Sequence, residues 1–193
     1  MKTLRRALLF ALPLLFTGGI PPRAADLPGE SIYHLSISMV DQDGYVSALA
    51  DRGGTPQLVS MFYTSCPYVC PLIIETMKRT QQALTPAQRQ RVGVLLVSFD
   101  PERDTPRRLR EVYHERKLDK ASWTLARIEA DDVRQLAAVL DIQYRLLANR
   151  EINHSSALVL LDADGRIVAR TDKIGEVDPD FVAAIQAALR SVR

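Results

Sequence analysis

The chain of 193 residues lacks the features that mark several large classes of protein. It has little net charge, since 25 lysines and arginines stand against 23 acids for a formal +2. A nearly neutral chain gives no electrostatic reason to expect nucleic-acid binding. It also lacks the polar composition of intrinsic disorder, because 47% of its residues are hydrophobic. Long apolar runs are missing except for one at the N-terminus, which excludes a polytopic membrane protein.

The first 25 residues have the layout of a targeting segment. Basic residues up to Arg6 precede an apolar stretch, residues 7–16, which Gly18 ends. The stretch is short for a membrane span, which needs about 20 apolar residues, and a charged start before a short apolar region is typical of a secretory signal. We predict that residues 1–25 are a signal peptide or an N-terminal membrane anchor. Residues 26–193 are then expected to form one extracytoplasmic domain.

Cysteine is scarce, and Cys66 and Cys70 are the two in the chain. In an oxidising compartment a pair of cysteines usually means a disulfide. A disulfide that closes so short a loop constrains little of the unfolded chain and therefore stabilises little. The pair is better explained as reactive or metal-binding.

The hydrophobic pattern predicts strands that alternate with helices. Strands are expected at residues 31–39, 45–49, 58–63, 92–99, 123–128, 142–147, 157–161 and 167–170. Helices are expected at residues 71–84, from 106 onward, at 131–140 and from 179 onward. This order favours an α/β layered domain. Because it ends in a strand hairpin and a helix, we predict by analogy a thioredoxin-like fold with an N-terminal β-hairpin.

The two cysteines lie where such a fold places ligands. Cys66 follows a predicted strand and Cys70 directly precedes a predicted helix, and open α/β sheets bind ligands at that edge. The N-terminus of a helix favours the thiolate form of a nearby cysteine. If the two residues form the first helical turn, their spacing puts both sulfurs on one face. Two thiolates suit Cu(I) or zinc and suit magnesium or calcium poorly.

A third ligand would have to come from the three histidines. His34, in the first strand pair, and His114, at a charged helix end, are expected at the surface. His154 precedes the strand at 157–161, in the segment that a thioredoxin-like topology places beside the cysteines. A lone histidine is more often structural than a ligand, so both interpretations of His154 stay open at this point.

Two acidic residues follow the strand at 92–99. In a functional role, Asp100 would orient His154 or help to dock a target protein. In a structural role, it would close a turn at the end of the strand. Asp104 or its neighbour Thr105 would cap the following helix.

In three segments the chain resembles the Sco/SenC family, thioredoxin-fold copper proteins that serve the assembly of cytochrome c oxidase. The segments are FYTSCPYVCP at 62–71, VSFDPERDTP at 97–106, and INHSS with LLDADG within 152–165. The resemblance implies that Cys66, Cys70 and His154 bind copper, as Cu(I) or Cu(II). It further implies delivery to the copper-bearing oxidase subunit and a periplasmic or other extracytoplasmic location, with a possible anchor in the inner membrane.

One position departs from the family pattern. Family members commonly have aspartate between the cysteines where this chain has Tyr68. A carboxylate there would raise nearby thiol pKa values and offer a charged docking point. The change therefore bears on partner choice, metal affinity and redox poise.

Two functions follow from the resemblance and the residues together. The first is a copper metallochaperone. The second is a thiol–disulfide oxidoreductase with Cys66 and Cys70 as catalytic residues, which acts on cysteines of the oxidase copper subunit or other extracytoplasmic targets and is served by a thioredoxin-like reductant. A peroxidase that uses Thr64 is a third interpretation, which the second cysteine fits poorly. Neither function predicts nucleic acid as a partner, and the membrane is expected only through the N-terminal segment.

Overall fold

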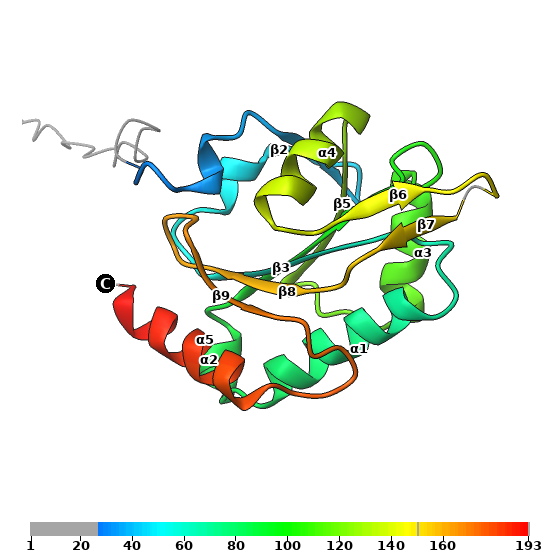
Figure 1. Ribbon diagram of the computed structural model, residues 1–193. Helices are drawn as coiled ribbons and strands as arrows, with labels where there is room; N and C mark the ends of the chain where they lie inside the picture. Colours follow the sequence, from blue (N-terminus) through cyan, green and yellow to red (C-terminus); the bar gives the residue numbers. More distant parts are fainter. Residues whose placement is uncertain (1–26, 150, 193) are drawn as a thin grey trace, which may run out of the picture.

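A seven-stranded sheet in the order β2-β1-β5-β4-β3-β8-β9 runs through the computed structural model (Figure 1). Its strands are β1 (Ser38–Asp41), β2 (Val46–Ala48), β3 (Gln57–Phe62), β4 (Gly93–Ser98), β5 (Trp123–Ile128), β8 (Leu158–Leu161) and β9 (Ile167–Thr171). The structure describes residues 27–149 and 151–192, so the predicted targeting segment lies outside the described residues.

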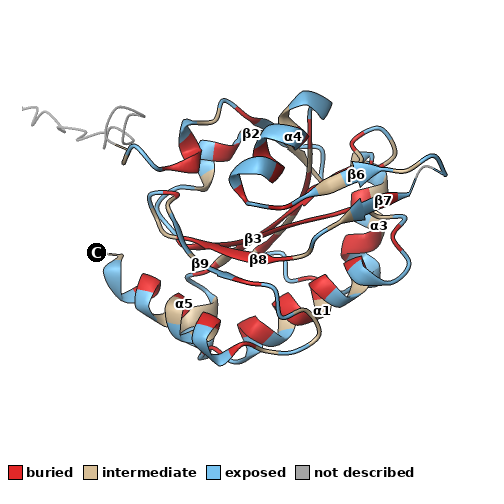
Figure 2. Ribbon diagram, in the orientation of Figure 1, coloured by how far each residue is buried: buried red, intermediate tan, exposed pale blue. Residues whose placement is uncertain are grey.

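The centre of the sheet is buried on both faces. Strands β3, β4 and β5 are parallel, and β8 and β9 continue the sheet antiparallel to their neighbours. Every residue of β3 is buried, as are all but the first of β4 (Figure 2). The continuous apolar runs in the sequence predicted these strands because a sheet covered on both faces needs apolar residues at every position.

Helices cover both faces of the sheet. They are α1 (Val69–Gln82), α2 (Pro86–Arg89), α3 (Pro106–Glu115), α4 (Ala130–Val139) and α5 (Pro179–Ser191). Helices α1 and α5 lie on one face and α4 on the other, while α3 packs against β5 and β1 (Figure 1). Thr105 and Asp178 cap α3 and α5, as their positions before a proline predicted. None of the helices in the described ranges is long and apolar enough to cross a bilayer.

The predicted N-terminal hairpin is confirmed as β1 and β2, but the prediction of a strand from residue 31 is wrong. Residues 32–34 form a 3-10 helix instead. The Ser31 hydroxyl donates to the backbone oxygen of Asp164, and the Ile32 N–H donates to that of Gly165 at 3.0 Å. The segment therefore follows the turn between β8 and β9 rather than a neighbouring strand.

The turn between β8 and β9 requires glycine at position 165, where residues 31–33 pack against it. Its φ is +81°, a backbone conformation that disfavours residues with a side chain, and an added Cβ would lie 2.4 Å from the ring of Tyr33.

A separate two-stranded ribbon lies beside the main sheet. It consists of β6 (Tyr144–Leu146) and β7 (Ile152–His154), with Tyr144 opposite His154. The strand predicted at 142–147 is thus present in shorter form, and β7 was not predicted. The carboxyl ends of β3 and β4, the N-terminus of α1 and the end of β7 all meet at one edge of the domain (Figure 1).

Candidate metal centre

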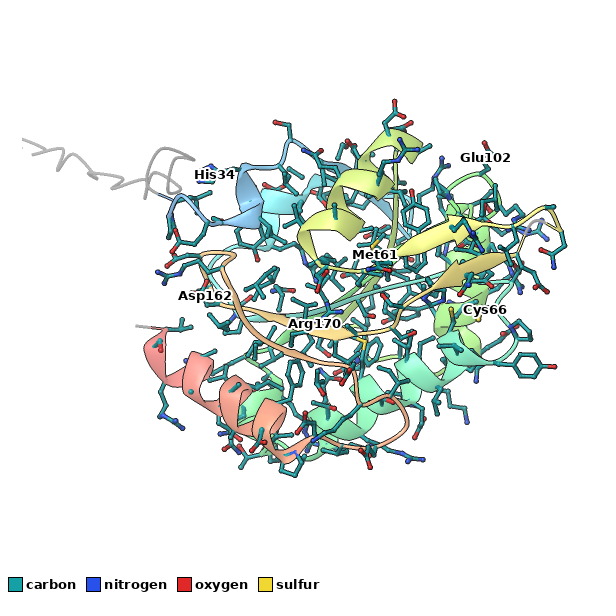
Figure 3. All side chains as sticks on the ribbon, viewed as in Figure 1. His34, Met61, Cys66, Glu102, Asp162 and Arg170 are labelled. Carbon is teal, nitrogen blue, oxygen red and sulfur yellow. The ribbon has the colours of Figure 1, made fainter. Side chains whose placement is uncertain are left out.

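Cys66 and Cys70 lie at the junction of β3 and α1 (Figure 3). The helix was expected to begin at Pro71, but it begins at Val69, so Cys70 lies within its first turn. Pro71 is tolerated there because the N–H groups of a first turn have no partner within the helix. Both cysteines are free thiols, and both are buried.

The structure brings the three predicted ligands together. The sulfurs of Cys66 and Cys70 and an imidazole nitrogen of His154 all lie within 4.8 Å of one another. A metal bound to sulfur and nitrogen at about 2.0–2.3 Å would hold three donors in a plane about 4 Å apart. The residues present therefore fit a three-coordinate ion after a small closing movement, and their soft thiolate and imidazole donors suit copper.

The Cys66 sulfur accepts a backbone hydrogen bond from the first turn of α1. The N–H of Cys70 donates to it at 3.4 Å, and the backbone amides of Tyr68 and Val69 lie close enough to lower its pKa as well. Burial raises the pKa of the Cys66 thiol, but these amides, together with the Cys70 side chain, lower it by more. The net pKa of Cys66 lies below its ordinary value, so the thiolate forms readily.

Cys70 has a different environment. Its side chain is 3% exposed, and burial raises the pKa of its thiol even though the Tyr63 N–H donates to the sulfur at 3.4 Å. A metal ion would deprotonate this thiol on binding, because a coordinating thiol gives up its proton. The two cysteines are therefore unequal, with Cys66 as the more reactive sulfur.

This difference predicts the order in which the thiols are alkylated. In the reduced protein at pH 7, Cys66 is expected to react with iodoacetamide at least about ten times faster than Cys70, because only the thiolate is nucleophilic. The Cys66 rate should rise with pH through a midpoint below that of an ordinary cysteine thiol. Mass spectrometry that locates the label measures both rates, and equal rates would contradict the inferred asymmetry.

His154 is oriented by its neighbours. Its Nδ1 lies 3.0 Å from the backbone oxygen of Ser155, which favours the tautomer with a proton on Nδ1 and leaves Nε2 free to bind a metal. Its ring centroid is 4.8 Å from that of Phe99 and 5.9 Å from that of Tyr63. Burial lowers the pKa of His154, which favours the neutral imidazole that metals bind.

The other histidines have no part in this group. His34 and His114 are exposed, as predicted. His34 lies against the backbone oxygen of Pro28, at 2.9 Å, and His114 lies in the last turn of α3.

The two aspartates have different roles. Asp100 forms an ion pair with Arg103, which favours the structural interpretation, and Ser155 rather than Asp100 orients His154. Thr105 caps α3, while Asp104 is completely buried.

Asp104 connects the cysteine loop to β4. Its carboxylate accepts hydrogen bonds from the N–H and the hydroxyl of Thr64, two residues before Cys66, and from the hydroxyl of Ser98 at 2.5 Å. No pattern in the sequence distinguishes this role from a helix cap, because Asp104 stands in the usual place for one.

Comparisons with known proteins place the chain among relatives of similar length. The SCO1/SenC family model matches residues 27–190. A protein of Stutzerimonas stutzeri whose name describes it as copper-binding is 25% identical over 183 residues, with 86% of each chain covered.

Two solved structures show the same fold. Bradyrhizobium japonicum ScoI with copper bound matches with a TM-score of 0.66 at 21% identity, covering 79% of this chain and 96% of that one. BsSco, described as having a disulfide switch and as a member of the Sco family of cytochrome c oxidase assembly proteins, matches with a TM-score of 0.67 at 21% identity. The match covers 80% of this chain and 91% of the BsSco chain. The predicted thioredoxin-like fold is confirmed.

Proposed function

Because this chain belongs to the SCO1/SenC family, we propose that it is a copper metallochaperone. It binds copper through Cys66, Cys70 and His154 and delivers it to the copper site of cytochrome c oxidase. The observation that carries the proposal is the convergence of three soft donor atoms within 4.8 Å. The copper-binding relative and the copper-bound ScoI support the choice of metal.

The donor set suits an ion that is carried and then released. Two thiolates and an imidazole hold Cu(I) in a three-coordinate arrangement, which leaves one side open to an incoming ligand. A thiolate or imidazole of the acceptor attacks that side, and the donors of this chain leave one at a time. Cys66 provides the first donor, because its lowered pKa makes its proton easier to remove than that of Cys70.

A second function is favoured by the asymmetry of the two thiols. The Cys66 thiolate attacks one sulfur of a target disulfide, forms a mixed disulfide and releases the other target sulfur as a thiolate. Cys70 then attacks Cys66, which frees the target as a dithiol and leaves this chain oxidised. A thioredoxin-like reductant restores the pair. The disulfide switch named for BsSco supports this alternative.

A peroxidase is less well supported. Such an enzyme needs a hydroxyl that is free to bind peroxide beside the reactive cysteine. The Thr64 hydroxyl is instead bonded to the buried carboxylate of Asp104.

The compartment and the acceptor form part of the same proposal. Residues 1–25 direct the chain out of the cytoplasm or anchor it to the inner membrane, and residues 26–193 form the copper-binding domain. The acceptor is the copper-bearing subunit of the oxidase. The sequence of the N-terminal segment and the association of BsSco with oxidase assembly support this assignment.

A transfer experiment tests the proposal. The reduced, untagged protein is loaded with one equivalent of Cu(I) and mixed with the reduced, metal-free copper-bearing domain of the oxidase. After separation, elemental analysis is expected to find most of the copper on the acceptor, and none transferred in the same assay with the Cys66→Ser variant. If copper stays on this chain in that assay, and the reduced, metal-free chain reduces the oxidised acceptor domain in a parallel assay, the oxidoreductase function replaces the chaperone function.

A further inference from the structure

A hollow of about 130 Å³ adjoins the two sulfurs on the side of α3. It lies between the N-terminal turn of α1 and helix α3, which lie close together at this edge of the domain (Figure 1). Its lining includes Cys66, Cys70, Arg108, Val112, Glu115 and Arg116. A cavity of about 150 Å³ accepts a benzene molecule, so the hollow has room for a group the size of a small side chain.

The hollow reaches the sulfurs without passing the imidazole. His154 lines a different hollow, together with Tyr144 and Arg145 of β6. Cys66 and Cys70 are only 9% and 3% exposed, so a reagent needs an opening of this kind to reach either sulfur. Cys66 is the more exposed of the two, and it is therefore the sulfur that a reagent in the hollow meets.

One face of α3 forms the outer wall of the hollow. The lining residues from α3 and its C-cap are spaced so that they lie on one side of the helix: Arg108, Val112, Glu115 and Arg116. Two of them carry a guanidinium group and one carries a carboxylate, so this wall has a net positive charge.

The charge of Arg108 is not cancelled by its ion pair. Arg108 is paired with Glu111 at an N–O distance of 2.9 Å, but Glu111 is also paired with Arg107 at 3.1 Å. One carboxylate thus faces two guanidinium groups, which leaves an excess of positive charge. An anion in the hollow is attracted to it, and because the hollow is partly enclosed, salt screens this attraction less than at an open surface.

We propose that this hollow is the site where an incoming reagent meets Cys66, and that Arg108 and Arg116 select reagents that carry negative charge beside the reacting atom. For a protein disulfide, the preferred substrate is then one whose cysteines have acidic neighbours. This application to disulfides rests on the proposed oxidoreductase function, whereas the site itself does not.

The exchange itself moves a negative charge from Cys66 into the hollow. The Cys66 thiolate bonds to one target sulfur, the target S–S bond breaks, and the other target sulfur leaves with the electron pair as a thiolate. A guanidinium keeps its own charge throughout the physiological pH range, so the two arginines stabilise this thiolate as well as an acidic substrate.

Iodoacetate and iodoacetamide measure the selectivity, because they share a size and a leaving group and differ by one negative charge. In the reduced, metal-free protein, the rate constant of Cys66 with iodoacetate is divided by that with iodoacetamide. This ratio is expected to be about ten times that of N-acetylcysteine amide, an uncharged thiol in open solution. Both reagents attack the same thiolate, so a change in the pKa of Cys66 cancels in the ratio.

Neutralising changes along α3 give the test matched controls. Arg108→Gln with Arg116→Gln should bring the ratio down to that of the uncharged thiol, and each change alone should lower it about three-fold, since the effects of separate charges add. Glu115→Gln removes the opposite charge from the same wall and should raise the ratio. Arg110→Gln should leave it unchanged, because Arg110 lies on the other side of α3, where its Nε donates to the Gln42 backbone oxygen at 3.0 Å. Thermal melting shows which variants fold.

The inference is overturned if the arginine variants keep the ratio of the unchanged protein, or if the unchanged protein has the ratio of the uncharged thiol. Either result is independent of copper and of protein disulfides. If the ratios change as expected but the chain neither transfers copper nor reduces the acceptor domain, the anion-selective site stands and the proposed function fails.

Discussion

Replacement of His154 by alanine is expected to weaken copper binding by more than about 100-fold, since loss of a group that merely supports a ligand already costs about 10- to 100-fold. The two sulfurs alone leave a two-coordinate site without the imidazole that closes the group of donors within 4.8 Å. Disulfide reduction requires only thiols, so the rate at which the variant reduces a small disulfide should stay near that of the unchanged protein.

The measurement is a competition titration of the reduced protein against a chromophoric Cu(I) chelator. His114→Ala is a suitable control, because His114 is an exposed histidine at the end of α3 and should leave the affinity unchanged. If His154→Ala binds copper as tightly as the unchanged protein, the chaperone function is lost and a dithiol function is all that remains.

Replacement of Asp104 by alanine is expected to lower the free energy of unfolding by about 3 kcal/mol, because buried donors left without an acceptor cost about 1–3 kcal/mol each. The donors are the N–H and hydroxyl of Thr64 and the hydroxyl of Ser98. For a chain of this size the melting temperature should fall by about 6–12 °C. Chemical denaturation and thermal melting measure the two quantities.

Glu102→Ala provides the control for this prediction, because Glu102 is an exposed acid in the same loop, at the periphery of the domain (Figure 3). Asp104→Asn keeps one acceptor oxygen and should lose less stability than the alanine variant. A melting temperature in Asp104→Ala equal to that of Glu102→Ala would mean that the buried network contributes nothing.

The stability contributed by Asp104 should also depend on pH. Burial raises the pKa of its carboxyl, although its hydrogen-bond donors lower it in part. Because the folded pKa lies above the unfolded one, the folded state holds the proton to higher pH. The contribution is therefore greatest below the ordinary pKa of aspartate and declines as the pH rises through the folded value. Unfolding curves at several pH values, compared with those of Asp104→Asn, measure this decline.

Local patterns in the sequence predicted the main sheet well. The strand Trp123–Ile128 has the predicted bounds, and α5 begins directly after its predicted Asp178 cap. These elements depend on apolar periodicity and capping, and both signals come from residues that are close together in the sequence. The strand predicted at 31–39 was wrong over its first residues, because Ser31 and Ile32 bond to the turn at Asp164 and Gly165, far along the chain.

The site was predicted in part for the same reason. Cys66 and Cys70 stand together in the sequence, and the topology brings His154 to them. Asp104 could not be assigned, because its partner Thr64 is 40 residues away and a helix cap fits the local sequence equally well. The packing of the Tyr63 ring against His154 depends on where β7 lies, and that strand was itself not predicted.

On the proposed function, the strand that carries His154 has a consequence for how copper is released. Among the described strands, β6 and β7 pair only with each other, whereas Cys70 is anchored in a helix packed on the central sheet. Withdrawal of the imidazole breaks no backbone hydrogen bond of the large sheet, but withdrawal of the Cys70 sulfur disturbs the hydrophobic core. The centre thus has one ligand, His154, on a separate two-stranded ribbon, and another, Cys70, that is held in a helix on the central sheet. On the proposed copper transfer, an acceptor that displaces His154 before the two sulfurs disturbs the fold least, so the backbone favours one order of bond breaking.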